Sequence, residues 1–191
     1  MGIIGEHNGC IASLEFFGSS HLLSGSEDGK VALFRTSDWE CLHVFHHKTP
    51  VSAVGIHPSG KLAISIACQN RSLRLWNLVT GKAAGKAKLP FAAERIIWSP
   101  SGSKYAIFGP SELAVYDASN TAEPVKRFKA SSGTCSKFLT ARFIDEELIV
   151  LAGEGSNLVM LPCSSNDLKV FKTIQKLRIK DISIVKSADI E

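Results

Sequence analysis

The sequence has no two cysteines at the close spacing of a metal-binding or redox motif. Its five cysteines are odd in number and far apart, at Cys10, Cys41, Cys68, Cys135 and Cys163. Disulfide scaffolds and zinc ribbons need paired or closely spaced cysteines. We therefore expect reduced thiols, as in a protein of the cytosol or nucleus.

Long apolar runs and strong net charge are also lacking. The opening "MGIIGEHNG" has neither a basic start nor an extended apolar stretch, so we expect no signal peptide, no membrane span and no membrane partner. The 22 Lys and Arg exceed the 18 Asp and Glu by only four, which is less than a dedicated nucleic-acid binder carries. The 191 residues suffice for one domain with a hydrophobic core.

Motifs for catalysis are absent too. There is no G-x-S-x-G elbow, and "GEGSN" at 153–157 lacks the third glycine and the lysine of a phosphate loop. The acidic run "DEE" at 145–147 stands at an expected hairpin tip, where solvated charge is the simplest interpretation. We expect no catalytic residue, no cofactor-binding residue, no cofactor and no small-molecule substrate.

The best candidate metal site is the histidine cluster in "HVFHH". It comprises His43, His46 and His47, with Cys41 nearby as a further ligand. A structural zinc site needs four ligands at suitable spacing. We place Cys41 and His43 on one face of a short strand, where the ligand set stays incomplete, and predict no metal.

A repeat of about forty residues organises the chain. Large apolar residues end the first expected strand of each unit, and others end its third strand; these pairs are Phe16 and Phe34, Ile56 and Trp76, Trp98 and Tyr116, and Phe143 and Leu161. The spacing within a unit is 18, 20, 18 and 18 residues, and the step between units is 40, 42 and 45. Pro-Ser-Gly turns in "IHPSGKLAI" and "WSPSGSKYAI" mark hairpins at matching places.

Each unit has the pattern of a four-stranded antiparallel sheet. Apolar residues alternate in "KVALF" and "LRLW", and no segment has a sustained helical period. Such units are typical of β-propeller blades, so the predicted fold class is all-β. We expect one domain over 1–191, and its blades cover about 7–46, 47–87, 88–129 and 130–175. Residues 176–191 would start a truncated blade or form a tail.

The first two units resemble the WD40 family. In that motif a His precedes the first strand, a Ser or Thr lies on the second, an Asp lies in the next turn and a Trp ends the third strand. The first unit has His7, Ser24, Asp28 and Phe34 in these places, and the second has His47, Ser65, Asn70 and Trp76. The resemblance implies a hydrogen-bond chain from Trp through Ser and His to Asp.

Both units depart from this pattern. Phe34 has no indole N–H, so the first unit would lose one member of the chain. Asn70 replaces the aspartate, which removes a charge-assisted bond to His47. The third and fourth units have Pro110 and Gly155 at the turn position and lack the histidine, so spacing alone supports them.

Four longer segments look like one subfamily, the PAK-interacting WD40 proteins, which also act in assembly of the large ribosomal subunit. These segments are "HLLSGSEDG", "WECLHVF", "VSAVGIHPSGKLAIS" and "LRLWNLVTGKA". The resemblance implies a longer chain with further blades, so we expect a fragment holding about four blades of a seven-blade ring. Its first and last blades would then expose sheet faces and edges.

The resemblance implies a non-catalytic scaffold with protein partners. These are pre-ribosomal assembly factors, ranked first, and the regulatory region of a PAK-type kinase that the protein restrains, with indirect association with rRNA. The implied location is the nucleolus and nucleus, and also the cytoplasm. The alternatives are a metal-dependent or hydrolytic enzyme on a propeller, and an RNA-binding module.

Three residues are candidates for a partner surface. Trp39 lies in the expected loop "TSDWE", where packing between blades is the favoured interpretation and a binding hot spot the alternative. Arg71 and Arg74 flank a turn of the second unit and could meet phosphates or an acidic partner. For the nearby Lys82, Lys86 and Lys88 we favour protection of an outer strand against sheet pairing.

Overall fold

Every regular element of the computed structural model is a β-strand, in a description that covers residues 5–132, 135–154, 157–163 and 169–173. This confirms the predicted all-β class. Gly155 and the proposed extra blade or tail at 176–191 lie outside the described residues. By its contacts the chain divides into two compact units, Met1–Trp98 and Ser99–Glu191.

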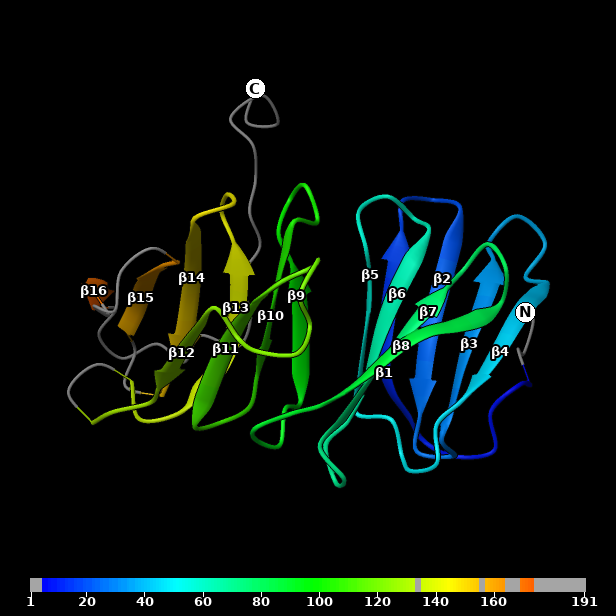
Figure 1. Ribbon diagram of the computed structural model, residues 1–191, viewed down its shortest axis with the longest axis horizontal. Coiled ribbons are helices and arrows are strands. Elements are labelled where there is room, and N and C mark those ends of the chain that lie inside the picture. Colours follow the sequence, from blue (N-terminus) through cyan, green and yellow to red (C-terminus); the bar gives the residue numbers. More distant parts are fainter. Residues whose placement is uncertain (1–4, 133–134, 155–156, 164–168, 174–191) are drawn as a thin grey trace. The chain divides into compact units, whose positions relative to one another are not determined.

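The strands form four antiparallel sheets of four strands each, and in each sheet strands that follow one another in sequence are neighbours (Figure 1). The first sheet comprises β1 (Ile11–Phe17), β2 (His21–Ser26), β3 (Lys30–Arg35) and β4 (Cys41–His46). The second comprises β5 (Ala53–Ile56), β6 (Leu62–Ala67), β7 (Ser72–Asn77) and β8 (Lys82–Lys88). Such four-stranded meanders are the blades of a propeller.

The remaining strands repeat the arrangement. The third sheet comprises β9 (Arg95–Trp98), β10 (Lys104–Phe108), β11 (Glu112–Asp117) and β12 (Lys126–Lys129). The fourth comprises β13 (Phe138–Phe143), β14 (Leu148–Gly153), β15 (Asn157–Pro162) and β16 (Lys169–Thr173).

Tight turns between the strands depend on residues that accept a positive φ. Gly29, in the turn between β2 and β3, has φ +80°, and Gly60, between β5 and β6, has φ +70°. An added Cβ at Gly60 would come within 2.6 Å of the Phe17 ring, so this turn is closed against the neighbouring sheet. The Pro-Ser-Gly sequence therefore serves both turn formation and packing.

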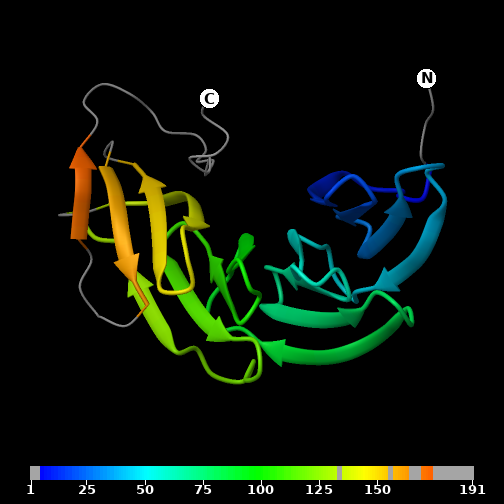
Figure 2. The same ribbon diagram turned by 90° about the horizontal axis from the view of Figure 1, so that it is seen from above.

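The first two sheets pack face to face around one hydrophobic core (Figure 2). The first sheet contributes the buried Leu23, Val31, Leu33 and Phe45, and the second contributes Val54, Ile56, Ala63 and Trp76. The Phe45 and Trp76 rings stack with their centroids 4.9 Å apart. Successive side chains of a strand point to opposite faces, so residues two apart, such as Val31 and Leu33, enter this core together.

The other face of the first sheet is uncovered at its first strand. Leu14 and Phe16 on β1 are 54 % and 58 % exposed, whereas Val54 and Ile56, at the same places in the second sheet, are buried. The first sheet covers Val54 and Ile56, but no described residue covers their counterparts in the same way. This matches the expected exposure of a face of the first blade.

A β-bulge in β4 corrects one sequence-based expectation. Leu33 pairs with His43 and Phe34 pairs with Cys41, so one extra residue, Leu42, stands between them. Because Leu33 and Phe34 point to opposite faces, Cys41 and His43 do as well. The prediction that Cys41 and His43 share a face is wrong.

The acidic run 145–147 is not simply solvated charge. In the turn between β13 and β14, Glu146 accepts hydrogen bonds from the Ser101 amide and the Ser103 hydroxyl, each at 2.7 Å. Glu147 pairs with Lys104. The turn thus binds the turn that precedes β10, a contact between sheets that local sequence does not reveal.

None of the described residues forms a helix with the length and apolarity that crossing a membrane requires.

Candidate functional site

The first sheet brings three of its predicted motif residues together. His7 Nε2 lies 2.6 Å from Ser24 Oγ on β2, and His7 Nδ1 lies 3.3 Å from Asp28 Oδ2. Asp28 also accepts hydrogen bonds at 2.8 Å from the amides of Asn8 and Lys30. The carboxylate therefore joins the segment before β1 to the turn between β2 and β3.

These contacts set the charge state of Asp28. Partial burial opposes ionisation, but the two amide donors and the nearby His7 ring outweigh it and lower the pKa of Asp28 below its ordinary value. All the hydrogen-bonding partners of this carboxylate are part of the blade's own framework. The geometry favours a structural role over chemistry.

The second sheet has a different set of three. The Trp76 indole donates to Ser65 Oγ at 2.7 Å, and Ser65 Oγ lies 2.6 Å from His47 Nε2. Because the indole is only a donor, the serine hydroxyl is available to donate to a neutral imidazole. The chain of hydrogen bonds runs from Trp76 through Ser65 to His47.

Asn70, the fourth motif residue of this sheet, is directed elsewhere. Its Oδ1 accepts a hydrogen bond from the Ser72 hydroxyl at 2.5 Å, and its carbonyl accepts one from Lys88. The first sheet therefore has the Ser–His–Asp part of the motif, and the second has the Trp–Ser–His part. Phe34, in the tryptophan position of the first sheet, is buried against Leu22 and Ala32.

His47 is held in its neutral form. Burial disfavours the imidazolium and the positive charge of Arg74 adds to this, while the contact with Ser65 acts the other way. Together they lower the pKa of His47 from 6.5 to about 4. An uncharged, buried imidazole with one hydroxyl partner stabilises the fold.

Trp39 lies on the surface of the described part of the chain. It is 46 % exposed in the turn from β3 to β4, and its φ is +60°. This backbone conformation is unfavourable for a bulky residue, and such strain concentrates at functional sites. The alternative of a binding contact is consistent with this exposure, and packing of Trp39 between blades stays a prediction.

The turn that carries Trp39 is fixed by an ion-pair network. Arg35 donates to Asp38 at 2.6 Å and also pairs with Glu40. The corresponding turn of the second sheet has Gly81 at its positive-φ position. Arg35 binds the residues directly before and after Trp39, so the tryptophan presents a large apolar surface in a defined position.

The two candidate arginines have different environments. Arg71 is exposed in the turn before β7, with φ +52°. Arg74, on β7, donates to the His46 carbonyl at 3.2 Å, and its Cζ lies 5.6 Å from the Trp76 ring centroid. A guanidinium over an aromatic face is stabilised while its charge stays accessible.

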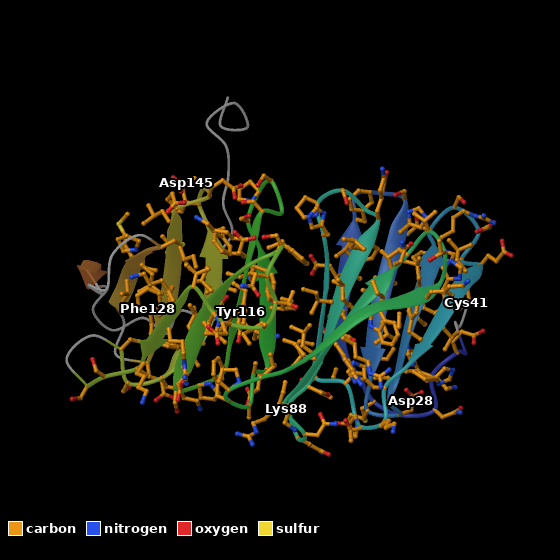
Figure 3. The ribbon with its side chains drawn as sticks, viewed as in Figure 1. Asp28, Cys41, Lys88, Tyr116, Phe128 and Asp145 are labelled. Atoms are coloured by element: carbon orange, nitrogen blue, oxygen red, sulfur yellow. The ribbon has the colours of Figure 1, made fainter. Side chains whose placement is uncertain are left out.

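Arg74 forms part of a concave site that sequence analysis did not find. A cavity of about 340 Å³, which we call the basic pocket, is lined by His47, Lys48, Asn70, Ser72, Leu73, Arg74, Lys86, Ala87 and Lys88. In the register of β7 and β8, Lys86 stands opposite Arg74, and Lys88 stands opposite Ser72. Figure 3 shows Lys88 at the same end of the first unit as Asp28. The sequence pattern favours edge protection for these lysines, whereas their place in the lining also allows ligand contact.

Within the described part of the chain, no three His, Cys, Asp or Glu side chains are grouped so that they could hold a metal ion. The β4 bulge accounts for this at the histidine cluster, since it turns Cys41 and His43 to opposite faces.

Comparison with known proteins gives concordant matches. Residues 1–35 and 39–77 match the family described as "WD domain, G-beta repeat". The p21-activated protein kinase-interacting protein 1-like of Gallus gallus is 36 % identical over 95 % of this chain and 48 % of its own length. The Homo sapiens p21-activated protein kinase-interacting protein 1 is 32 % identical over 86 % of this chain and 41 % of its own.

A more distant match is Protein MAK11 of Saccharomyces cerevisiae. It is 35 % identical over 47 % of this chain and 25 % of its own length. The chain thus spans about half the length, or less, of the curated relatives it matches.

Proposed function

The chain belongs to the WD40-repeat family, and we propose that it is a non-catalytic scaffold that binds and restrains a p21-activated protein kinase. The observation that carries this proposal is the 36 % identity, over 95 % of the chain, to a relative named for its interaction with such a kinase. A rigid blade framework that presents loops supports it, because binding residues lie on loops that a scaffold positions.

Trp39 is the residue best placed to contact the kinase. Its exposed ring on a fixed turn has the features of an interface hot spot. We propose that it inserts into an apolar site on the kinase's regulatory region.

Replacement of this side chain tests the contact. We expect Trp39→Ala to weaken binding of the purified kinase regulatory region at least about tenfold, because hot-spot truncation costs about 2 kcal/mol or more. Thermal unfolding should be unchanged or slightly improved, since the ring is exposed. Titration calorimetry measures the affinity.

The matched control is Val79→Ala. Val79 is an apolar residue, 68 % exposed, in the equivalent turn of the second sheet. It should leave affinity within about twofold of the wild type, as surface substitutions outside an interface do. Equal loss of affinity in both variants would remove Trp39 from the interface, and no binding by the wild-type chain would refute the kinase proposal.

A second role in assembly of the large ribosomal subunit is favoured by the similarity to Protein MAK11 together with the family resemblance of the sequence. It would involve pre-ribosomal assembly factors, indirect contact with rRNA, and a location in the nucleolus and nucleus, and also in the cytoplasm. Depletion followed by analysis of rRNA precursors tests this role. Accumulation of large-subunit precursors supports it, and unchanged precursors exclude it.

The enzyme alternative makes a distinct prediction. A metal-dependent hydrolase would retain stoichiometric metal after purification, whereas a scaffold of the kind proposed would not. Elemental analysis of the purified chain distinguishes the two.

A further inference from the structure

The basic pocket stands in a part of the chain that has no acidic residue. Between Glu40 and Glu94 the sequence contains seven Lys and Arg and no Asp or Glu. The whole chain has 22 Lys and Arg and 18 Asp and Glu. The sequence outside this segment therefore contains 15 of the cations and all 18 carboxylates. The modest net charge of the whole chain conceals a second blade that is strongly basic.

Several cations elsewhere on the described surface form ion pairs with carboxylates. Arg35 pairs with Asp38 and Glu40 in the first sheet, and other pairs join Arg127 to Glu112 and Lys104 to Glu147. None of the ion pairs found among the described residues involves Lys48, Arg74, Lys86 or Lys88. No carboxylate of the described residues therefore neutralises these four positive charges.

Two of the four cations are held by neutral partners. Arg74 donates to the His46 carbonyl, and Lys88 donates to the Asn70 carbonyl. Carbonyl acceptors fix the positions of these groups without neutralising their charge. Arg74 and Lys86 are register partners on adjacent strands, so the positive charges converge on one site. Mutual repulsion of the cations would be relieved by an anionic ligand.

The lining favours a carboxylate-bearing peptide over nucleic acid. Leu73, Ala87 and the lysine stems supply apolar wall for the methylene groups of a glutamate side chain. Sites for single-stranded RNA rely on exposed aromatic rings for stacking, and none lines the pocket. Two rings lie nearby, His47 in the lining and Trp76 beneath Arg74, and both are buried.

We propose that the basic pocket of the second blade binds a glutamate- or aspartate-rich peptide segment of a protein partner, whose carboxylates contact Lys48, Arg74, Lys86 and Lys88. The site is independent of the turn that carries Trp39. It adds a second, charge-selective contact to the proposed scaffold role, and binding to it is measurable on the purified chain whether or not the partner is a kinase.

The test measures fluorescence anisotropy of a labelled polyglutamate peptide with the full chain at physiological ionic strength. The wild type should bind the peptide, and the double variant K86E/K88E should bind at least about tenfold more weakly, because two attractions become repulsions. K86Q/K88Q, which only removes the charges, should give an intermediate loss. Circular dichroism checks that the variants fold. We expect them to fold because both lysines lie on β8, the outer strand of its sheet.

The matched control is K61E/K82E. It changes the net charge of the same blade equally, but Lys82 lies at the opposite end of β8 from Lys88, and neither residue lines the pocket. We expect it to retain peptide affinity within about twofold. Equal weakening in both double variants would show a non-specific charge effect and overturn the proposal.

Two further outcomes also overturn it. One is absence of peptide binding by the wild type. The other is tighter binding of single-stranded RNA of matched charge with the same dependence on Lys86 and Lys88, which would assign the pocket to nucleic acid. Failure of the kinase-binding experiment leaves this measurement unaffected, so the two proposals fail separately.

Discussion

At the scale of single residues, the described hydrogen bonds divide one motif between two blades. His7, Ser24 and Asp28 connect a loop to the first blade, and Trp76, Ser65 and His47 connect two strands and a loop in the second. In each blade one departure from the motif, Phe34 in the first and Asn70 in the second, shortens the chain of hydrogen bonds. The residue types were evident in the sequence, but which three members of each set make contact depends on side-chain positions.

Stability should depend on pH through His47. Its pKa is about 4 in the folded state and 6.5 ordinarily, so the unfolded chain binds more protons between these values. Its stabilising contribution is therefore complete above pH 6.5 and is lost as the pH falls toward 4. This lowering of the His47 pKa corresponds to at most about 3 kcal/mol in the free energy of unfolding. Partial solvation of the ring reduces the contribution to roughly 2 kcal/mol.

Urea unfolding at pH 7 and pH 4.5 measures this dependence. The variant His47→Gln should be less stable than the wild type at pH 7, since glutamine replaces a well-packed ring, and should lose less stability on acidification. An unchanged difference between the two pH values would show that His47 is not the group that titrates.

At the scale of elements, equivalent strands have unequal environments. Phe16 on β1 and Ile56 on β5 occupy the same place in their sheets, yet one is exposed and the other buried. Neither local sequence nor strand pattern distinguishes them, because burial depends on whether another sheet covers that face.

Alanine substitutions at this pair test the difference. Ile56→Ala should lower the free energy of unfolding by about 2–4 kcal/mol through loss of buried contacts and formation of a cavity. Phe16→Ala, although it removes a larger side chain, should cost less than about 1 kcal/mol in the purified chain. Chemical denaturation measures both, and a larger cost at Phe16 would mean that the β1 face is covered.

A second contact between elements depends on Glu146. Burial raises the pKa of this carboxyl, but the hydrogen bonds from Ser103 and from the Ser101 amide outweigh it and lower the pKa to about 2. The stabilising contribution is therefore present above pH 4.5 and is lost as the pH falls toward 2.

Removal of this carboxylate should lower the free energy of unfolding by about 1 kcal/mol at pH 7. The Ser101 amide and the Ser103 hydroxyl then lose their acceptor, but at this partly exposed site they can hydrogen-bond to water instead. Glu146→Ala should approach the wild-type stability near pH 2. The exposed Glu123 supplies the control, as Glu123→Ala should be nearly neutral at both pH values. A similar cost in both variants would argue against the contact between turns.

At the scale of the whole molecule, the five thiols report on both compact units. Cys10 is exposed, Cys41 and Cys68 are partly buried, and Cys135 and Cys163 are buried. Burial raises the pKa of the Cys135 and Cys163 thiols, which lowers their thiolate fraction and so their reactivity.

Labelling with a thiol reagent should therefore show one fast site in the native chain and two sites that react only on unfolding. Mass spectrometry identifies the modified residues. Because Cys135 and Cys163 lie in the second unit, the denaturant concentration that exposes them reports on that unit separately. Rapid native labelling of Cys135 would contradict the buried position of its side chain.

The sequence by itself determined the class of fold and the repeat. The near-constant spacing of residues such as Ile56 and Trp76, and turns such as Pro58-Ser59-Gly60, follow from strand periodicity and local backbone preference, which are written in short segments. The WD40 resemblance followed from the same local signals.

Only the tertiary structure decided what depends on residues distant in sequence. The β4 bulge separated Cys41 from His43, a neighbouring turn made Glu146 a hydrogen-bond acceptor, and pairing of β7 with β8 brought Lys86 to Arg74. The acid-free segment around those cations was visible in the sequence, but a surface charge becomes a site only when strand register and sheet packing place several side chains around one cavity.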